Sequence, residues 1–305
     1  MTDPTNAPTP SATPVTATLV RGDEVAPEAL HAAFGRAFAD YLIGPFQVPL
    51  EEWAPFLARQ GVDLPRSRVA LDASGTPLAF AFVAPRPALG RWRLATMGAT
   101  PTARGSGAAP ALLDDLIARA AAAGLQAVEL EVFVQNDRAR KLYEGRGFQP
   151  VQDLFGYLAQ PGLLARGEAP PGTLTWAPQA VDLPRALAWL DAAERRIPDL
   201  PLQVTATTVR HGQDYRAWQL GKEGVGGDAR AQVVFSLPDE TVMLHSLIAP
   251  REDDAQALLR ALATVYGDRR VRVPQLQRDD LGGAVLRALG AEPQPLHQQL
   301  MVRPL

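Results

Sequence analysis

The strongest structural signal in this sequence lies in Thr96–Phe148, which reads TMGATPTARGSGAAPALLDDLIARAAAAGLQAVELEVFVQNDRARKLYEGRGF. Apolar residues recur at helical spacing over 108–122, which predicts a helix. Residues 127–133 are strand-like, and 137–146 predict a second helix. A loop of small residues, 101–107, precedes the first helix. The stretch therefore predicts a strand–helix–strand arrangement.

The flanking residues extend this pattern to a complete domain. Before the stretch we expect helices over 27–41 and 51–60, and strands over 16–20, 68–72, 78–83 and 92–99; a final strand follows over 148–158. The three successive strands at 68–72, 78–83 and 92–99 predict an antiparallel meander. The later strand–helix–strand units predict parallel pairing. We therefore expect an α/β fold with a mixed central sheet covered by helices on both faces.

The second part of the chain repeats this order weakly. Strands are expected over 173–176, 216–220, 232–237, 242–248, 270–274 and 298–302, and helices over 184–196, 254–266 and 281–289. The repetition predicts two copies of one architecture. Composition and proline or glycine content divide the chain into a disordered tail (1–16), a first domain (17–160), a linker (161–172) and a second domain (173–305).

Composition excludes several classes of function. The 305 residues carry a net charge of −3, which argues against a nucleic-acid partner. The absence of cysteine excludes thiol nucleophiles and Cys-ligated zinc, and the four histidines lack metal-ligand spacing, so we expect no metal. No apolar stretch is long enough for a membrane span, and residues 1–17 lack the regions of a signal peptide. We expect a cytoplasmic protein without a membrane partner.

The loop Arg104–Ala109 follows a strand and opens a helix. Its glycines permit a sharp turn, and unpaired N–H groups at the helix start can bind phosphate. It is neither a Walker A loop nor a dinucleotide G-x-G-x-x-G loop. A turn that only packs the helix on the strand remains the alternative.

Four further side chains are candidates for chemistry. Asn136 is a natural N-cap, and Tyr143 lies two helical turns later on the same face. These two could equally be a cap and a half-buried aromatic. Glu129 and Glu131 share one face of their strand, which indicates either an open cleft or a solvated face.

Together these residues resemble the GNAT (Gcn5-related) N-acetyltransferase family. The family's acetyl-CoA loop pattern is matched by Arg104, Gly107 and Ala109. Its second signature, Asn-x-x-Ala-x-x-Leu-Tyr-x-x-x-Gly-Phe, is matched by Asn136, Ala139, Leu142, Tyr143, Gly147 and Phe148. The resemblance spans 17–160 in element order and is specific over 96–148.

The resemblance implies a cofactor site and a catalytic pair. Acetyl-CoA would be bound by Met97, Gly98, Ala99, Arg104, Gly105, Ser106, Gly107, Ala108, Ala109, Asn136, Arg140 and Tyr143. Tyr143 would be the general acid and Glu131 the base, with Glu129 as a rival base. Ser106 stands where a basic residue is common, so the contact of the 3′-phosphate stays open among Arg104, Arg138, Arg140, Lys141 and solvent.

The second copy lacks these features. The loop before its helix is Pro250–Asp254, which contains no glycine and three carboxylates that would repel a pyrophosphate. Leu286 and Pro274 stand where Tyr143 and Glu131 stood. We expect a tandem GNAT arrangement with a degenerate, non-catalytic C-terminal copy, which either walls the substrate cleft or stabilises the first.

The function expected from the resemblance is acetyl transfer from acetyl-CoA to a primary amine in the first domain. The alternative is a non-catalytic acyl-CoA-binding or regulatory protein. The acceptor, a small-molecule or peptide amine, cannot be read from the sequence, and the oligomeric state, including a homodimer, stays open.

Overall fold

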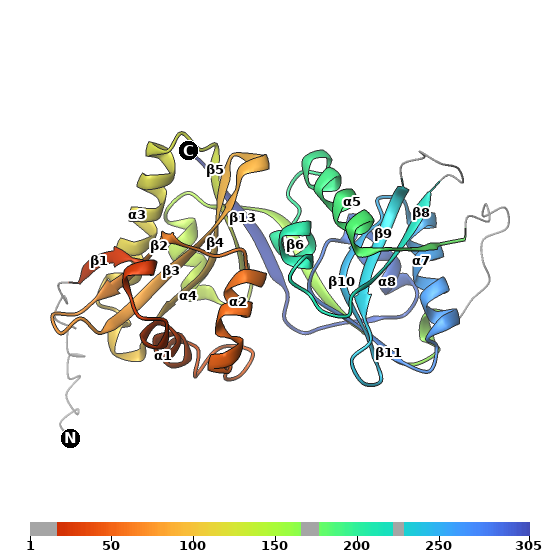
Figure 1. The fold of residues 1–305 in the computed structure, drawn as a ribbon, viewed down its shortest axis with the longest axis horizontal. Helices are drawn as coiled ribbons and strands as arrows, with labels where there is room; N and C mark the ends of the chain where they lie inside the picture. Colours follow the sequence, from red (N-terminus) through yellow and green to blue (C-terminus); the bar gives the residue numbers. More distant parts are fainter. Residues whose placement is uncertain (1–16, 166–176, 222–228) are drawn as a thin grey trace, which may run out of the picture.

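The computed structural model describes residues 17–165, 177–221 and 229–305. The predicted tail (1–16), most of the predicted linker (166–172) and the strand expected at 173–176 lie outside these residues. The described chain forms two lobes side by side, joined by strands that run between them (Figure 1).

The first half follows the predicted order of elements. Its helices are α1 (Pro27–Ala37), α2 (Trp53–Arg59), α3 (Ala108–Ala122) and α4 (Asp137–Glu144), with a 3-10 turn η4 (Pro101–Ala103). Its strands are β1 (Thr18–Arg21), β2 (Asp63–Leu71), β3 (Pro77–Arg86), β4 (Arg91–Ala99), β5 (Ala127–Phe133) and β6 (Gln149–Ala159).

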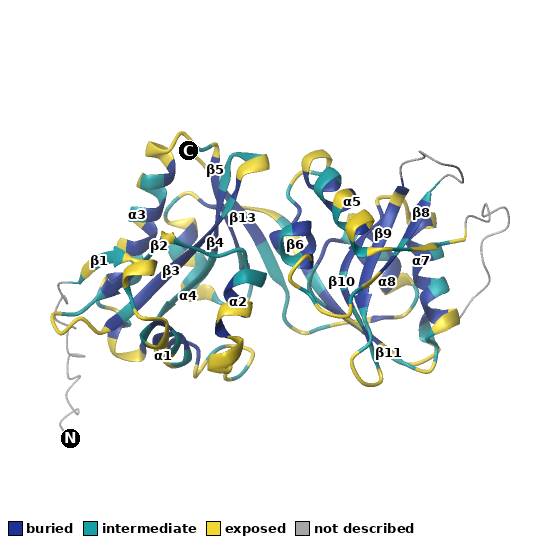
Figure 2. Ribbon diagram, in the orientation of Figure 1, coloured by how far each residue is buried: buried dark blue, intermediate teal, exposed yellow. Residues whose placement is uncertain are grey.

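Helices cover both faces of this sheet because β3 is apolar on both. Phe80 and Phe82 pack with the aromatic residues of α1 and α2, whereas Ala79 and Ala81 pack against α3. Successive side chains of a strand point to opposite faces, so one continuous apolar run serves two helical layers. Figure 2 shows these strands buried at the centre of the lobe. The predicted mixed sheet with two helical layers is confirmed.

The second half has the same kinds of elements. Its helices are α5 (Leu183–Arg196), α6 (Ala206–Val209), α7 (Glu252–Val265) and α8 (Gly283–Ala288), with the 3-10 turns η6 (Leu202–Val204) and η7 (Asp279–Leu281). Its strands are β7 (Gln179–Val181), β8 (Arg216–Gly221), β9 (Ala229–Ser236), β10 (Thr241–Ile248), β11 (Arg270–Gln277), β12 (Glu292–Pro293) and β13 (Gln298–Pro304). The strand β7 and the helix α6 were not predicted.

The two halves share one sheet. Within the described residues the strand order is β1-β2-β3-β4-β5-β13-β6-β11-β10-β9-β8-β7. The last strand, β13, pairs antiparallel with both β5 and β6, and β6 pairs with β13 near its start and with β11 near its end. The expectation that β5 and β6 pair directly is therefore wrong, because a strand from the far end of the chain lies between them.

A buried charge network also joins the halves. Arg86 at the end of β3 contacts Glu129 on β5 and Glu194 on α5, and donates to the carbonyl oxygen of Leu200 at 2.7 Å. Arg91 bridges Glu129 and Asp199. Arg86 and Glu129 are almost fully buried, so each charge depends on its partners for compensation. The network fixes α5 and the residues that follow it against the end of β3 and the start of β4.

Candidate active site

The two parallel strands β4 and β5 separate after three paired positions. They pair only where Arg91–Arg93 face Ala127–Glu129, although both strands continue well beyond. On its other edge, β4 has an extra residue, Ala95, because Phe82 pairs with Thr96 and Val83 pairs with Leu94. An extra residue in one strand leaves its backbone unpaired and bends the strand. The bend accompanies a gap between the strands on the side where β4 ends.

The loop after β4 presents free backbone donors. Gly105 and Gly107 have φ of +84° and +89°, a region that favours glycine, and an added side-chain carbon at either would meet open space. The N–H groups of Gly105, Gly107 and Ala109 have no partner among the described residues, whereas that of Ala108 bonds Ser106 Oγ at 3.3 Å. This cluster at the start of α3 suits an anion such as a pyrophosphate.

Arg104 anchors this loop to α1. Its guanidinium donates to both oxygens of Asp40 and, at 3.2 Å, to the carbonyl oxygen of Ala37. The hydrogen bond from Arg104 lowers the pKa of Asp40, so the pair stays charged at neutral pH. Arg104, one of the residues left open as a contact of the 3′-phosphate, thus has its charge paired with a carboxylate of the same half.

Helix α4 places Tyr143 in the gap. The side chain of Asn136 caps the helix by accepting from the N–H of Ala139 at 3.2 Å. Tyr143 is 7% exposed and packs edge-on against Phe148 with 5.9 Å between ring centroids. Burial raises the pKa of Tyr143 well above its ordinary value, so its hydroxyl keeps its proton at neutral pH. Arg140, one helical turn after Asn136, pairs instead with Glu144 at 2.9 Å.

A cavity of about 250 Å³ lies between α1, α2 and the separated strands. Among the predicted site residues it brings together Met97, Glu131, Asn136 and Tyr143. The glycine loop and Arg140 do not line it. Its remaining lining is Phe34, Phe38, Tyr41, Ile43, Phe46, Phe56, Gln60, Arg93, Leu94, Ala95, Thr96, Leu130, Val132, Ala139, Gln203 and Gln298.

The two candidate bases have different surroundings. Glu131 lines the cavity and pairs with Arg93, with 2.7 Å from both Nε and Nη2 to Oε2. Glu129 is fully buried in the network with Arg86 and Arg91, away from the cavity. Of the two alternatives, the solvated face does not hold for either carboxylate, because guanidinium groups of β3 and β4 cover them.

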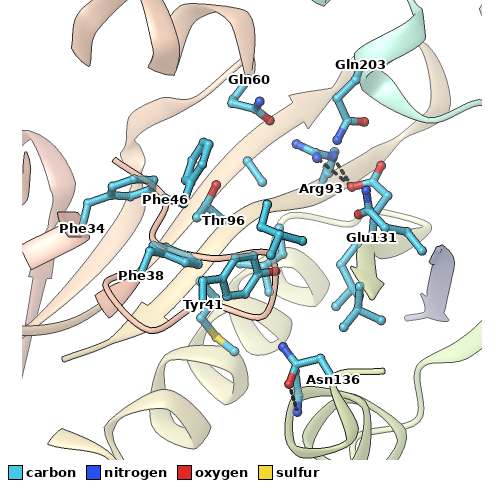
Figure 3. Close-up of a pocket in the computed structure, with 18 of the residues that line it drawn as sticks. Phe34, Phe38, Tyr41, Phe46, Gln60, Arg93, Thr96, Glu131, Asn136 and Gln203 are labelled. Atoms are coloured by element: carbon cyan, nitrogen blue, oxygen red, sulfur yellow. Dashed lines mark hydrogen bonds and ion pairs between the residues drawn. The ribbon is translucent and has the colours of Figure 1, made fainter. Parts of the chain in front are cut away.

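Two of the cavity residues that sequence reasoning missed contact Glu131 directly. Arg93 could have been found, because Arg91 and Arg93 alternate on β4 as Glu129 and Glu131 do on β5. Gln203 could not, because it comes from η6 of the second half. In the amide orientation that satisfies both of its polar atoms, Gln203 donates to Glu131 Oε1 at 3.1 Å and accepts from Arg93 Nη2. The second half therefore supplies part of the cavity wall (Figure 3).

The second half also has two parallel strands that separate, but its own chain bridges the gap. β10 and β11 pair only over Thr241–Met243 and Arg270–Arg272. Beyond that, Gln277 Nε2 donates to the carbonyl oxygens of Leu247 and Leu281, at 3.3 and 3.0 Å. The N–H of Ala249 likewise donates to the carbonyl oxygen of Leu281 at 3.3 Å.

The start of α7 is acidic. Glu252, Asp253 and Asp254 occupy its first turn, and the hollow beside it is lined by Glu252, Asp279 and Asp280. Carboxylates at a helix N-terminus satisfy the helix dipole themselves and repel an added anion. This region is chemically unlike the glycine loop of the first half.

The described part of the chain offers neither a cluster of metal ligands nor a membrane-spanning helix. No group of three or more His, Cys, Asp or Glu side chains there is arranged to hold a metal ion. No helix there is both long and apolar enough to cross a membrane.

Comparisons with known proteins agree with this geometry. Residues 29–148 match the model of the acetyltransferase (GNAT) family. No curated protein matches the chain. A GCN5-related N-acetyltransferase from Sphaerobacter thermophilus is 14% identical with a TM-score of 0.59, covering 94% of this chain and 95% of that one.

Two other solved structures have the same fold at similar length. A putative acetyltransferase from Pyrococcus horikoshii is 12% identical with a TM-score of 0.61, covering 96% of this chain and 90% of that one. A tandem GNAT protein from the clavulanic acid biosynthesis pathway is 16% identical with a TM-score of 0.57, covering 94% and 98%. At these identities the likeness is one of fold.

Proposed function

From the match of residues 29–148 to the model of the GNAT acetyltransferase family, we propose that the first half transfers an acetyl group from acetyl-CoA to a primary amine. The observation that carries the proposal is the buried Tyr143 in the cavity between separated strands. The free N–H groups of the loop after β4 support it. A protein that only bound acyl-CoA would not need a proton donor in a cavity beside the cofactor loop.

The loop residues would hold the cofactor. The N–H groups of Gly105, Gly107 and Ala109 are donors without partners among the described residues, which fits the pyrophosphate of acetyl-CoA. The backbone of Met97 and Ala99 would bind the pantetheine arm. The edge of β4 from Ala95 onward, freed from β5, would stabilise the oxyanion of the tetrahedral intermediate.

The amine would attack the thioester carbonyl directly. A C–N bond forms, the C–S bond breaks, and the departing thiolate needs a proton, which the Tyr143 hydroxyl would donate. The raised pKa of Tyr143 suits an acid that must remain protonated until the thiolate leaves.

We keep Glu131 as the proposed base for the amine proton, because Glu131 lines the cavity and Glu129 does not. Its Oε2 atom is held by Arg93, whereas Oε1 contacts the neutral amide of Gln203. Oε1 is therefore the oxygen that would receive the proton.

The second half, in this proposal, binds no acetyl-CoA. Its strand gap is bridged by Gln277 and Leu281, and its helix start is acidic. It stabilises the first half through the buried network with Arg86, and it supplies Gln203 to the cavity wall. A cytoplasmic location and an assembly such as a homodimer stay predictions from the sequence.

An acceptor screen tests the proposed function. Because the chain contains no cysteine, a thiol reagent in the assay reports only the CoA that is released. We expect CoA release that depends on both acetyl-CoA and an added primary amine, together with an N-acetylated product by mass spectrometry. Tight acetyl-CoA binding without transfer to any amine would favour the acyl-CoA-binding alternative instead.

A further inference from the structure

The cavity has two unlike walls. Residues of α1, the following turn and α2 form an aromatic wall, made of Phe34, Phe38, Tyr41, Phe46 and Phe56. The opposite wall is polar and consists of Arg93, Glu131 and Gln203. Figure 3 shows the polar group on one side of the cavity and the phenylalanines on the other. An occupant complementary to both walls has an apolar body and a polar end.

One hydrogen-bond donor of the polar wall has no partner. The side chain of Arg93 is 3% exposed, and its Nε and Nη2 atoms are bonded to Glu131 and Gln203. Its Nη1 atom has no hydrogen-bond partner among the described residues, although it is buried. A buried donor without an acceptor is unfavourable, so an oxygen atom of the occupant placed at Nη1 would be bound.

The charges around this point limit the kind of oxygen. The guanidinium groups of Arg86, Arg91 and Arg93 are paired with the carboxylates of Glu129, Glu131, Glu194 and Asp199. Three positive charges therefore face four negative ones. This surplus disfavours a further carboxylate or phosphate and tolerates an ammonium group. The oxygen at Arg93 Nη1 is then a neutral one.

The geometry points to an acceptor amine that has an aromatic or other apolar body and a neutral carbonyl oxygen, the oxygen accepting a hydrogen bond from Arg93 Nη1. This inference rests on the proposed acetyl transfer and names its substrate class. Arg93 would determine specificity by binding the carbonyl oxygen, whereas Tyr143 would act as the acid. Free amino-acid amides and the first residue of a peptide share the required chemistry.

Three amines of similar size test the inference. Phenylalaninamide has the neutral carbonyl, 2-phenylethylamine lacks it, and phenylalanine replaces it with a carboxylate. We expect kcat/KM for phenylalaninamide to exceed that for 2-phenylethylamine by at least about tenfold, and phenylalanine to be the poorest. A Phe-Ala-Ala peptide amide, assayed alongside, distinguishes a peptide source from a small-molecule source, and transfer to either amide supports the inference.

Arg93→Lys is the test variant. Lysine keeps a positive charge beside Glu131 but has a single side-chain nitrogen, so the donor corresponding to Nη1 is lost. We expect the preference for phenylalaninamide over 2-phenylethylamine to fall to about twofold or less. Arg91→Lys is the matched control, because Arg91 lies on the same strand outside the cavity, and its preference should equal that of the wild type.

Ligand binding by the unaltered protein tests the inference without depending on the folding of a variant. 3-Phenylpropanamide and 3-phenylpropanoate lack the amine and differ only at the carbonyl. We expect the amide to stabilise the protein against thermal unfolding in the presence of CoA. The carboxylate should require an at least about tenfold higher concentration for the same stabilisation.

The outcomes separate this inference from the proposed function. Turnover of 2-phenylethylamine or phenylalanine as efficient as that of phenylalaninamide would overturn the inference while leaving acetyl transfer intact. Equal stabilisation by the amide and the carboxylate would overturn it too. No CoA release with any amine would overturn the proposed function, and amide-selective stabilisation would then still support the site.

Discussion

Arg86 and Glu194 form a buried ion pair between the two halves of the chain, with 2.7 Å between Arg86 Nη2 and Glu194 Oε1. Arg86 lies at the end of β3, and Glu194 lies on α5. The same guanidinium contacts Glu129 on β5, which belongs to the pair of strands that separate at the cavity. The pair therefore connects the position of the second half to the strands that form the site.

Removal of Glu194 should destabilise the protein. Glu194→Ala leaves Arg86 buried with one carboxylate instead of two, so we expect the free energy of unfolding to fall by roughly 3 kcal/mol. Asp191→Ala on the same helix is the control, because Asp191 is 46% exposed and 3.9 Å from Arg210, and should cost less than about 1 kcal/mol. Urea unfolding measures both. Equal effects of the two substitutions would contradict a role of the buried pair.

Tyr143→Phe should slow the reaction without weakening cofactor binding. The substitution removes only the hydroxyl, so we expect kcat to fall by roughly 10²–10⁴, the range for loss of a general acid. The Kd of acetyl-CoA should change by less than about threefold, since the loop donors are untouched. Tyr266→Phe in the second half is the control and should leave kcat unchanged. A wild-type kcat for Tyr143→Phe at saturating amine would remove Tyr143 from the acid role.

Gly107→Asp should abolish cofactor binding. The carboxylate would stand beside the free N–H groups that are proposed to hold the pyrophosphate, and the repulsion should raise the Kd of acetyl-CoA by at least about tenfold. Gly75→Asp is a matched control, because Gly75 also has positive φ (+81°) and open space, but lies in the β2–β3 turn. A titration in which both variants bind alike would mean that the loop is not the pyrophosphate site.

His245 should make stability depend on pH in a defined window. Its Nε2 atom is 2.7 Å from Ser236 Oγ, its ring stacks on Tyr215, and burial lowers its pKa to about 4 from 6.5. Between these values the unfolded chain binds more protons than the folded one, so His245 makes stability fall as the pH falls from about 6.5 to about 4.

His245→Gln removes this contribution. As the pH falls through the window, we expect the variant to gain up to about 3 kcal/mol relative to the wild type in urea unfolding. A constant difference between His245→Gln and the wild type across this window would contradict the lowered pKa.

Local patterns were sufficient to predict most elements and part of the site. Helix α3 and strand β5 have the predicted bounds, because their apolar spacing is strong and uninterrupted. The resemblance assigned Met97, Glu131, Asn136 and Tyr143 to one site, and all four line the cavity. What local patterns do not contain is long-range pairing: nothing in residues 298–304 indicates that they insert between β5 and β6.

The same limit explains the site residues that were missed. Gln203 reaches the cavity only because α5 and η6 of the second half dock against the first, although Gln203 lies far from Glu131 and Arg93 along the chain. Likewise, Glu129 and Glu131 read alike in the sequence. Only the positions of Arg86 and Arg93 assign one to the buried network and the other to the cavity.

We propose that each chain has one working acetyl-CoA site, in its first half. Isothermal titration of the full chain with CoA measures the number of sites directly. We expect a stoichiometry of one CoA per chain, lost in Gly107→Asp and retained in Gln277→Ala, which alters only the bridged gap of the second half. Two CoA molecules per chain, or binding that survives Gly107→Asp, would contradict it.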